Sequence, residues 1–149
     1  MRQAKRLRMT SIYDAFLMGL AALFAASGFA SAQTARTAAY LVRQDFSDCT
    51  NQNVPNVNSP LVGGYMWLTR TPDGNTTVKV AMTVEPRTTY HLFLKCVRLL
   101  GDITTDDEGV AEVSFTFPTN SVGTVFAFDM YPEGAPLGNK YQSSQIVFK

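Results

Sequence analysis

The stretch TTDDEGVAEVSF, residues 104–115, decides the fold of this chain. Three consecutive acidic residues precede Gly109, and apolar residues then recur at every second position. Alternation with a period of two predicts a half-buried β-strand over 110–118, and Asp-Asp-Glu-Gly before it is typical of a tight hairpin turn. The stretch therefore predicts a strand that follows a turn, with Ala111, Val113, Phe115 and Phe117 directed into the core.

The chain after residue 33 repeats this pattern and shows no helical period. Short alternating runs, separated by Gly, Pro, Asn and Asp, predict strands over 39–46, 65–71, 77–85, 89–99, 101–105, 110–118, 123–131 and 141–149. About eight strands in one domain of this length predict an all-β fold, specifically an antiparallel two-sheet β-sandwich of immunoglobulin-like type. The sequence shows no internal repeat, linker or low-complexity segment.

Two stretches resemble a known group of domains. TTDDEGVAEVSF resembles the Thr-Asp-x-x-Gly-x-Ala-x-Val hairpin of bacterial immunoglobulin-like and transthyretin-like secreted sandwich domains, and VEPRTTYHLFL, residues 84–94, is similar to a strand entry of such modules. The resemblance implies a sandwich fold and no catalytic residues. The chain departs from the Cys–Trp–Cys pattern of antibody domains, because Cys96 lies on a mid-chain strand.

The first 32 residues are typical of a secretory signal peptide. A basic leader precedes an uncharged apolar run at 15–26, and Ala30-Ser31-Ala32 fits a cleavage site. The run is shorter than the roughly 20 residues that span a bilayer, which favours cleavage over an uncleaved N-terminal anchor. We therefore expect a single mature domain, 33–149, in a secreted or periplasmic location, where the sequon at Asn75 would matter only in a host that glycosylates.

The charge of the mature domain argues against nucleic acid as a partner. The whole chain has 13 basic and 12 acidic residues, of which the leader holds four and one, so the mature domain carries 9 and 11 and a net charge of −2. No basic stripe remains for nucleic acid or an anionic membrane. No second apolar segment is long enough to insert into a membrane after signal cleavage.

The two cysteines, Cys49 and Cys96, predict one disulfide. An even pair in an exported protein is most simply paired, and the chain-entropy model gives about 4 kcal/mol for a loop of this length. Two buried free thiols, or one reactive cysteine, are the alternatives. No Cys-x-x-Cys motif is present, which disfavours a redox role.

The sequence gives little support for catalysis, and we expect no enzyme and no cofactor. His91 is the only histidine, no Gly-x-Ser-x-Gly motif is present, and one histidine with two paired cysteines is too few for a zinc site. A half-exposed strand residue is the simpler interpretation of His91. Carboxylates such as Asp102 and Asp129 leave a small secreted hydrolase as an alternative, although their spacing singles out no pair.

The acidic residues around the turn allow two interpretations. Asp102, Asp106, Asp107 and Glu108 could supply oxygens to calcium. Their spacing does not match a known calcium loop, and Asp also bonds its own backbone in turns. The turn is therefore favoured, and we predict no metal site.

Binding residues are expected in two places. The long Asn-rich loop at 47–60 exceeds the usual length of a connection, and such loops often carry function. Tyr65-Met66-Trp67 cannot all point inward on one strand, so either Met66 or the aromatic pair faces outward. We predict an exported binding or adhesion module for a protein or surface glycan; a structural subunit of a surface layer or fibre is a further alternative, and oligomers are possible. The predicted contacts are Asn51, Asn53, Asn56, Asn58, Tyr65 and Trp67.

Overall fold

The computed structural model describes residues 36–57 and 60–148, and the predicted signal peptide, residues 1–32, lies outside them. The described residues form ten strands and one short 3-10 turn, η1 (Thr119–Ser121). The strands are β1 (Arg36–Arg43), β2 (Val62–Arg70), β3 (Asn75–Thr83), β4 (Thr89–Leu94), β5 (Arg98–Thr104), β6 (Val110–Pro118), β7 (Val125–Phe126), β8 (Phe128–Pro132), β9 (Tyr141–Ser143) and β10 (Ile146–Val147). Within this part of the chain, no helix is long and apolar enough to cross a membrane.

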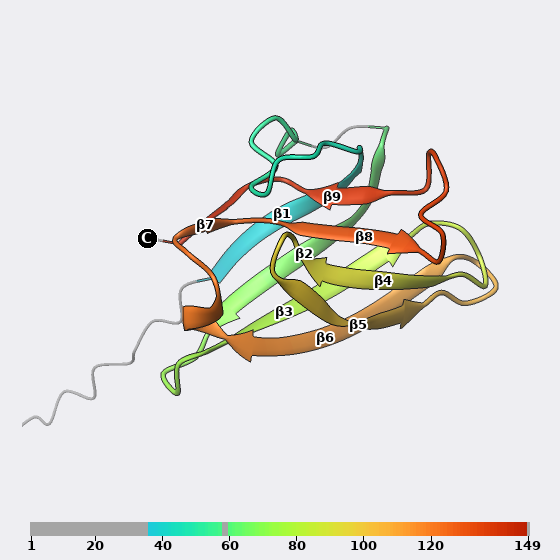
Figure 1. Ribbon diagram of the computed structural model, residues 1–149. Coiled ribbons are helices and arrows are strands. Elements are labelled where there is room, and N and C mark those ends of the chain that lie inside the picture. Colours follow the sequence, from blue (N-terminus) through green and yellow to red (C-terminus); the bar gives the residue numbers. More distant parts are fainter. Residues whose placement is uncertain (1–35, 58–59, 149) are drawn as a thin grey trace, which may run out of the picture. The chain divides into compact units, whose positions relative to one another are not determined.

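Eight strands form one antiparallel sheet in the order β5-β4-β8-β9-β1-β2-β3-β6, and β7 pairs with β10 in a small second sheet (Figure 1). The large sheet curls until its two edge strands, β5 and β6, contact each other. A methyl group on Gly101 of β5 would lie only 2.6 Å from the ring of Phe115 in β6. The prediction of an all-β antiparallel fold is confirmed, and the large sheet is nearly barrel-shaped. The finer assignment to an immunoglobulin-like two-sheet sandwich stays a prediction.

The inner face of the curled sheet holds the core. Alternate residues on each strand point inward, because successive strand side chains leave opposite faces of the sheet. The largest fully buried side chains come from seven of the strands: Leu41, Val42, Met66, Leu68, Tyr90, Leu92, Leu94, Ile103, Phe117, Phe128, Met130 and Ile146. Phe128 contacts Phe117 and Phe126 edge-on, and Phe126 contacts Phe148 in the same way, which closes one end of the core with aromatic rings.

The hairpin predicted from TTDDEGVAEVSF is confirmed. The Asp106 carboxylate accepts the backbone N–H of Glu108 at 3.0 Å and of Val110 at 2.7 Å, which fixes the turn. Gly109 has φ +81°, and a Cβ there would lie 2.1 Å from the Val84 carbonyl oxygen, so only glycine fits. β6 covers the predicted range 110–118. Of its inward residues, Ala111 and Phe117 are buried, whereas Val113 and Phe115 are half-buried beside the core.

Three of the predicted strands are interrupted. The predicted strand 89–99 ends at Leu94, because Cys96 takes φ +59° and the Val97 N–H bonds the Leu94 carbonyl at 2.9 Å. Residues 98–104 then return as β5, which joins the end of that run to the separately predicted strand 101–105. The runs 123–131 and 141–149 each break into two short strands, so that their ends pair in the small sheet.

Candidate functional site

Three aromatic side chains line up on the outer face of β1 and β2, and we call Tyr40, Tyr65 and Trp67 the aromatic strip. Met66 is fully buried, so its neighbours Tyr65 and Trp67 face outward, and Tyr65 is 40% exposed. Tyr40 of β1 lies directly opposite Tyr65, with ring centroids 4.9 Å apart. The Tyr65 and Trp67 rings lie 6.2 Å apart and within 20° of parallel. The strip therefore places three neighbouring aromatic rings on the outer side of the sheet.

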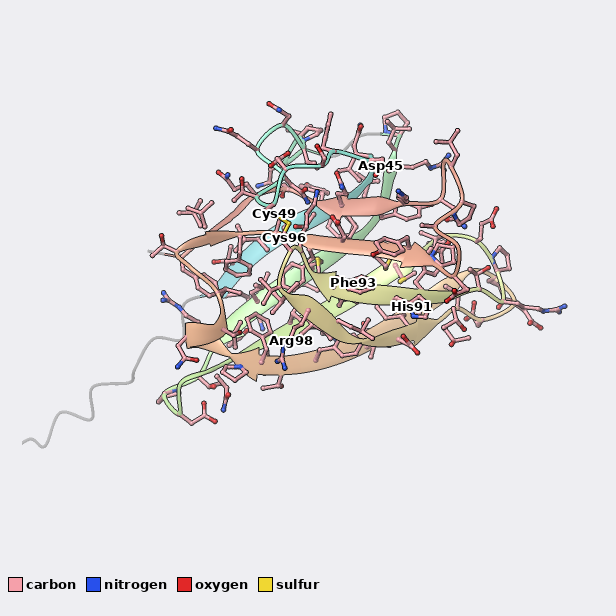
Figure 2. The ribbon with its side chains drawn as sticks, in the orientation of Figure 1. Asp45, Cys49, His91, Phe93, Cys96 and Arg98 are labelled. Atoms are coloured by element: carbon pink, nitrogen blue, oxygen red, sulfur yellow. A yellow bond between two sulfur atoms is a disulfide. The ribbon has the colours of Figure 1, made fainter. Side chains whose placement is uncertain are left out.

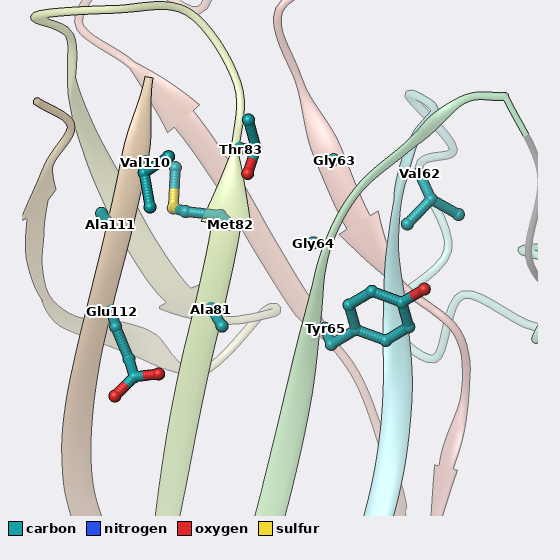
Figure 3. A pocket seen from close by; sticks show the side chains of 10 residues that line it. All are labelled: Val62, Gly63, Gly64, Tyr65, Ala81, Met82, Thr83, Val110, Ala111 and Glu112. Carbon is teal, nitrogen blue, oxygen red and sulfur yellow. The ribbon is translucent and has the colours of Figure 1, made fainter. Parts of the chain in front are cut away.

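A shallow hollow of about 380 Å³ lies beside Tyr65. Figure 3 shows Tyr65 of β2, Ala81 of β3 and Glu112 of β6 on three neighbouring strands of this hollow. Ala81 contributes only one methyl group to its lining. A Cβ on Gly64 would lie 2.5 Å from the Ala81 carbonyl oxygen, so β2 and β3 approach closely at this point. The lining residues are Val62, Gly63, Gly64, Tyr65, Ala81, Met82, Thr83, Val110, Ala111 and Glu112.

A second hollow of similar size lies beside Trp67 and is polar. It is lined by Arg36, Trp67, Thr69, Thr77, Lys79, Glu112 and Ser114. Lys79 bonds Glu112 across β3 and β6 at 2.7 Å, and both side chains are about half-exposed. Glu112 lines both hollows, so they lie next to each other along β2, β3 and β6, and we call the pair the groove. The groove combines aromatic rings with cationic, anionic and hydroxyl groups.

The predicted asparagines do not join this groove, since neither hollow includes a described residue of the loop between β1 and β2. Asn53 and Asn56 are exposed, and Asn56 accepts a hydrogen bond from the Ser144 hydroxyl at 2.9 Å. Asn58 lies outside the described residues. Asn51 is completely buried, so its prediction as a surface contact is corrected: its amide donates to the carbonyls of Phe128 and Ser143.

The predicted disulfide between Cys49 and Cys96 is present, and the two residues lie together in Figure 2. It fastens the loop after β1 to the turn between β4 and β5, with a Cα–Cα distance of 5.6 Å. Next to it, Asn51, Lys95 and Asp129 form what we call the buried polar cluster. The side chains of Lys95 and Asp129 are 6% and 18% exposed, and the Lys95 ammonium lies 3.5 Å from the Asp129 carboxylate.

Three of the carboxylates weighed for catalysis or metal binding have separate partners. Asp102 contacts His91, Asp129 contacts Lys95, and Asp107 pairs with Arg87. In residues 36–57 and 60–148, no three His, Cys, Asp or Glu side chains gather in a way that could hold a metal ion. Asn75, in the predicted sequon, begins β3 and its amide donates to Asp73.

His91 on the outer face of β4 is flanked by two carboxylates. Its Nδ1 lies 2.6 Å from Asp102 and its Nε2 lies 3.4 Å from Glu133 (His91 is labelled in Figure 2). The hydrogen bond to Asp102, together with the negative charge of both neighbours, raises the pKa of His91 above its ordinary value. The folded protein therefore holds the His91 proton more tightly than an unperturbed histidine does.

We expect this arrangement to make stability depend on pH. The folded protein holds the His91 proton more tightly than the unfolded chain, whose histidine pKa is about 6.5. The stabilisation is therefore complete below that pH and is lost as pH rises through the folded-state pKa. Urea unfolding at a series of pH values should show this fall in wild type and a flatter profile in His91→Gln. Equal slopes in the two proteins would contradict it.

Sequence reasoning missed two features of this region. Tyr40 carried no functional signal, because its pairing with Tyr65 depends on the register between β1 and β2. The alternation around Met66 could have placed Tyr65 and Trp67, but not the residues that β3 and β6 add to the hollow beside them. Comparison of the chain with known protein families and with curated proteins gives no match, so the proposal below rests on the groove itself.

Proposed function

We propose that this protein is an exported, non-catalytic binding module that recognises a surface glycan through the aromatic strip and the groove beside it. The observation that carries the proposal is the grouping of three neighbouring aromatic rings on the outer face of β1 and β2, with Tyr65 and Trp67 nearly parallel along β2. Exposed aromatic surface of this kind is energetically unfavourable in water and marks interaction sites. The predicted signal peptide and the disulfide support a secreted or periplasmic location.

The chemistry of the groove favours a sugar chain over a compact apolar ligand. A pyranose ring presents a face of C–H groups that packs flat on an aromatic ring, while its hydroxyls need donors and acceptors at the edge. Arg36, Lys79 and Glu112 supply such groups, together with the hydroxyls of Thr69, Thr77 and Ser114. An open groove on a sheet face also suits an extended chain, because such a chain can enter and leave without unfolding the module.

The finer structural assignment belongs with this proposal. We propose that the curled sheet is a variant of the immunoglobulin-like sandwich, with β5, β4, β8 and β9 as one layer and β1, β2, β3 and β6 as the other. The groove then lies on the outer face of the second layer, which runs from β1 to β6 in the sheet.

The test is a glycan array followed by calorimetry on the best ligand. Trp67→Ala should weaken binding at least about tenfold, which corresponds to about 1.4 kcal/mol. Phe93→Ala is the matched control, because Phe93 is a partly exposed aromatic residue on the outer face of β4, stacked on Tyr131 at 4.9 Å. Equal losses in the two variants, or a protein partner retained in place of any glycan, would overturn the proposal.

A further inference from the structure

The buried polar cluster brings an amine against a carboxamide. The Lys95 Nζ donates to the Asn51 side-chain oxygen at 2.5 Å, and Asn51 is 0% exposed. This oxygen is bonded to the Asn51 side-chain carbonyl carbon, which is the electrophilic atom of the carboxamide. Asp129 completes the cluster, and within the described residues its Oδ1 is a buried oxygen with no hydrogen-bond partner. An amine nucleophile, an amide electrophile and a carboxyl group therefore share one largely buried site, at which Lys95 and Asp129 also line a surface hollow.

We propose that Lys95 and Asn51 become joined by an intramolecular amide bond, with Asp129 as the group that moves the protons. The proposal does not depend on the glycan groove, which lies on other strands. It assigns a covalent function to the Lys95–Asp129 ion pair and the Asn51 carboxamide beside it, a largely buried arrangement that is otherwise unfavourable.

The reaction balances without any oxidant or cofactor. One proton passes from the Lys95 ammonium to the Asp129 carboxylate, which leaves a neutral amine. The nitrogen lone pair attacks the Asn51 side-chain carbon, the new C–N bond forms, and Asp129 carries a proton from the attacking nitrogen to the Asn51 nitrogen. The old C–N bond then breaks, ammonia leaves, and it takes up the remaining proton as ammonium.

The surroundings of the cluster suit each step. Burial raises the pKa of the Asp129 carboxyl, and the nearby Lys95 charge opposes that rise, so a protonated acid is accessible there. The Asn51 amide nitrogen donates to the backbone carbonyls of Phe128 at 3.2 Å and Ser143 at 3.0 Å. These two dipoles would hold a nitrogen more strongly as it gains positive charge and departs.

The amide product would also keep a hydrogen bond to a neighbouring backbone carbonyl. The Lys95 Nζ donates to the Phe46 carbonyl, and the single N–H that remains after amide formation can keep this bond. Other paired lysines lack this setting: the side chains of Lys79 and Lys140 are 47% and 28% exposed and contact carboxylates. An amine in water stays protonated at neutral pH and is a poor nucleophile toward an amide.

Mass spectrometry of the purified full chain, after reduction and alkylation of the disulfide, tests the bond. Trypsin cuts after unmodified lysine and arginine, so an uncrosslinked chain yields the linear peptides 44–70 and 88–95. A crosslinked chain blocks cleavage after Lys95 and yields one branched peptide of 44–70 joined to 88–98, lighter than the sum of its parts by one ammonia. We expect the branched peptide.

Two variants separate the bond from simple packing. Asp129→Asn keeps the shape of the carboxyl group but cannot carry the proton, and Lys95→Arg keeps the charge but is not a nucleophile; both should yield only linear peptides. Circular dichroism and an intact disulfide show that each variant has folded. Linear peptides from folded wild type would overturn the proposal, as would a branched peptide from Asp129→Asn.

Discussion

Replacing Phe128 with alanine should lower the free energy of unfolding by about 4 kcal/mol. Phe128 is completely buried, and its ring centroid lies 6.2 Å from that of Phe117 and 5.8 Å from that of Phe126. The substitution removes the apolar area of the ring, the edge-on contacts and the filling of that end of the core. Because the neighbouring rings belong to β6 and β7, they cannot close the space without moving whole strands.

Urea unfolding followed by tryptophan fluorescence measures this loss, with Trp67 as the reporter. Phe93→Ala serves as the control, because Phe93 is half-buried and mainly loses its stack on Tyr131, worth about 1 kcal/mol. Similar losses in the two variants would show that the aromatic end of the core is not the compact cluster described above.

Removing the disulfide should have an effect that depends on Asp129. Cys49 and Cys96 close a loop with a sequence separation of 47, for which the chain-entropy model gives about 4 kcal/mol. The proposed bond between Asn51 and Lys95 closes almost the same loop. We therefore expect the double change Cys49→Ala, Cys96→Ala to cost about 4 kcal/mol in the Asp129→Asn background.

In the wild-type background the same double change should cost about 1 kcal/mol or less, because the loop remains closed and loop-closure entropy changes only with the logarithm of loop length. The four proteins form a double-mutant cycle, measured by urea unfolding. An equal loss of unfolding free energy in both backgrounds would show that the disulfide and the proposed amide bond act independently, or that the amide bond does not form.

Much of the fold was predictable because period-two alternation reports directly on which side chains face the core. β6 matches its predicted range, and the turn at Asp106 follows from residue types that favour turns locally. The break at Cys96 was not predictable, because the alternation continues through the turn and the positive φ is imposed by the pairing of β4 with β5. The small β7–β10 sheet depends likewise on contacts between distant segments.

The candidate site was predictable only in part. Tyr65 and Trp67 follow from the rule that neighbouring strand residues face opposite sides, once Met66 is placed inside. The Asn-rich loop misled sequence reasoning, because polarity alone suggests exposure, whereas Asn51 is buried where a carboxamide satisfies two backbone carbonyls. Asn51, Lys95 and Asp129 lie close together only because folding brings three separate segments of the chain side by side. No local sequence pattern predicts this proximity.

The curl of the large sheet has a consequence for assembly. An edge strand normally offers a row of unsatisfied backbone groups to a strand from another molecule, which is how strand-exchange polymers grow. Here β5 and β6 contact each other, and the Phe115 ring of β6 lies against Gly101 of β5. An incoming strand would first have to separate β5 from β6. If copies of the domain pack into a surface layer, we expect them to do so through side chains on their faces, and the individual molecules to remain separable without unfolding.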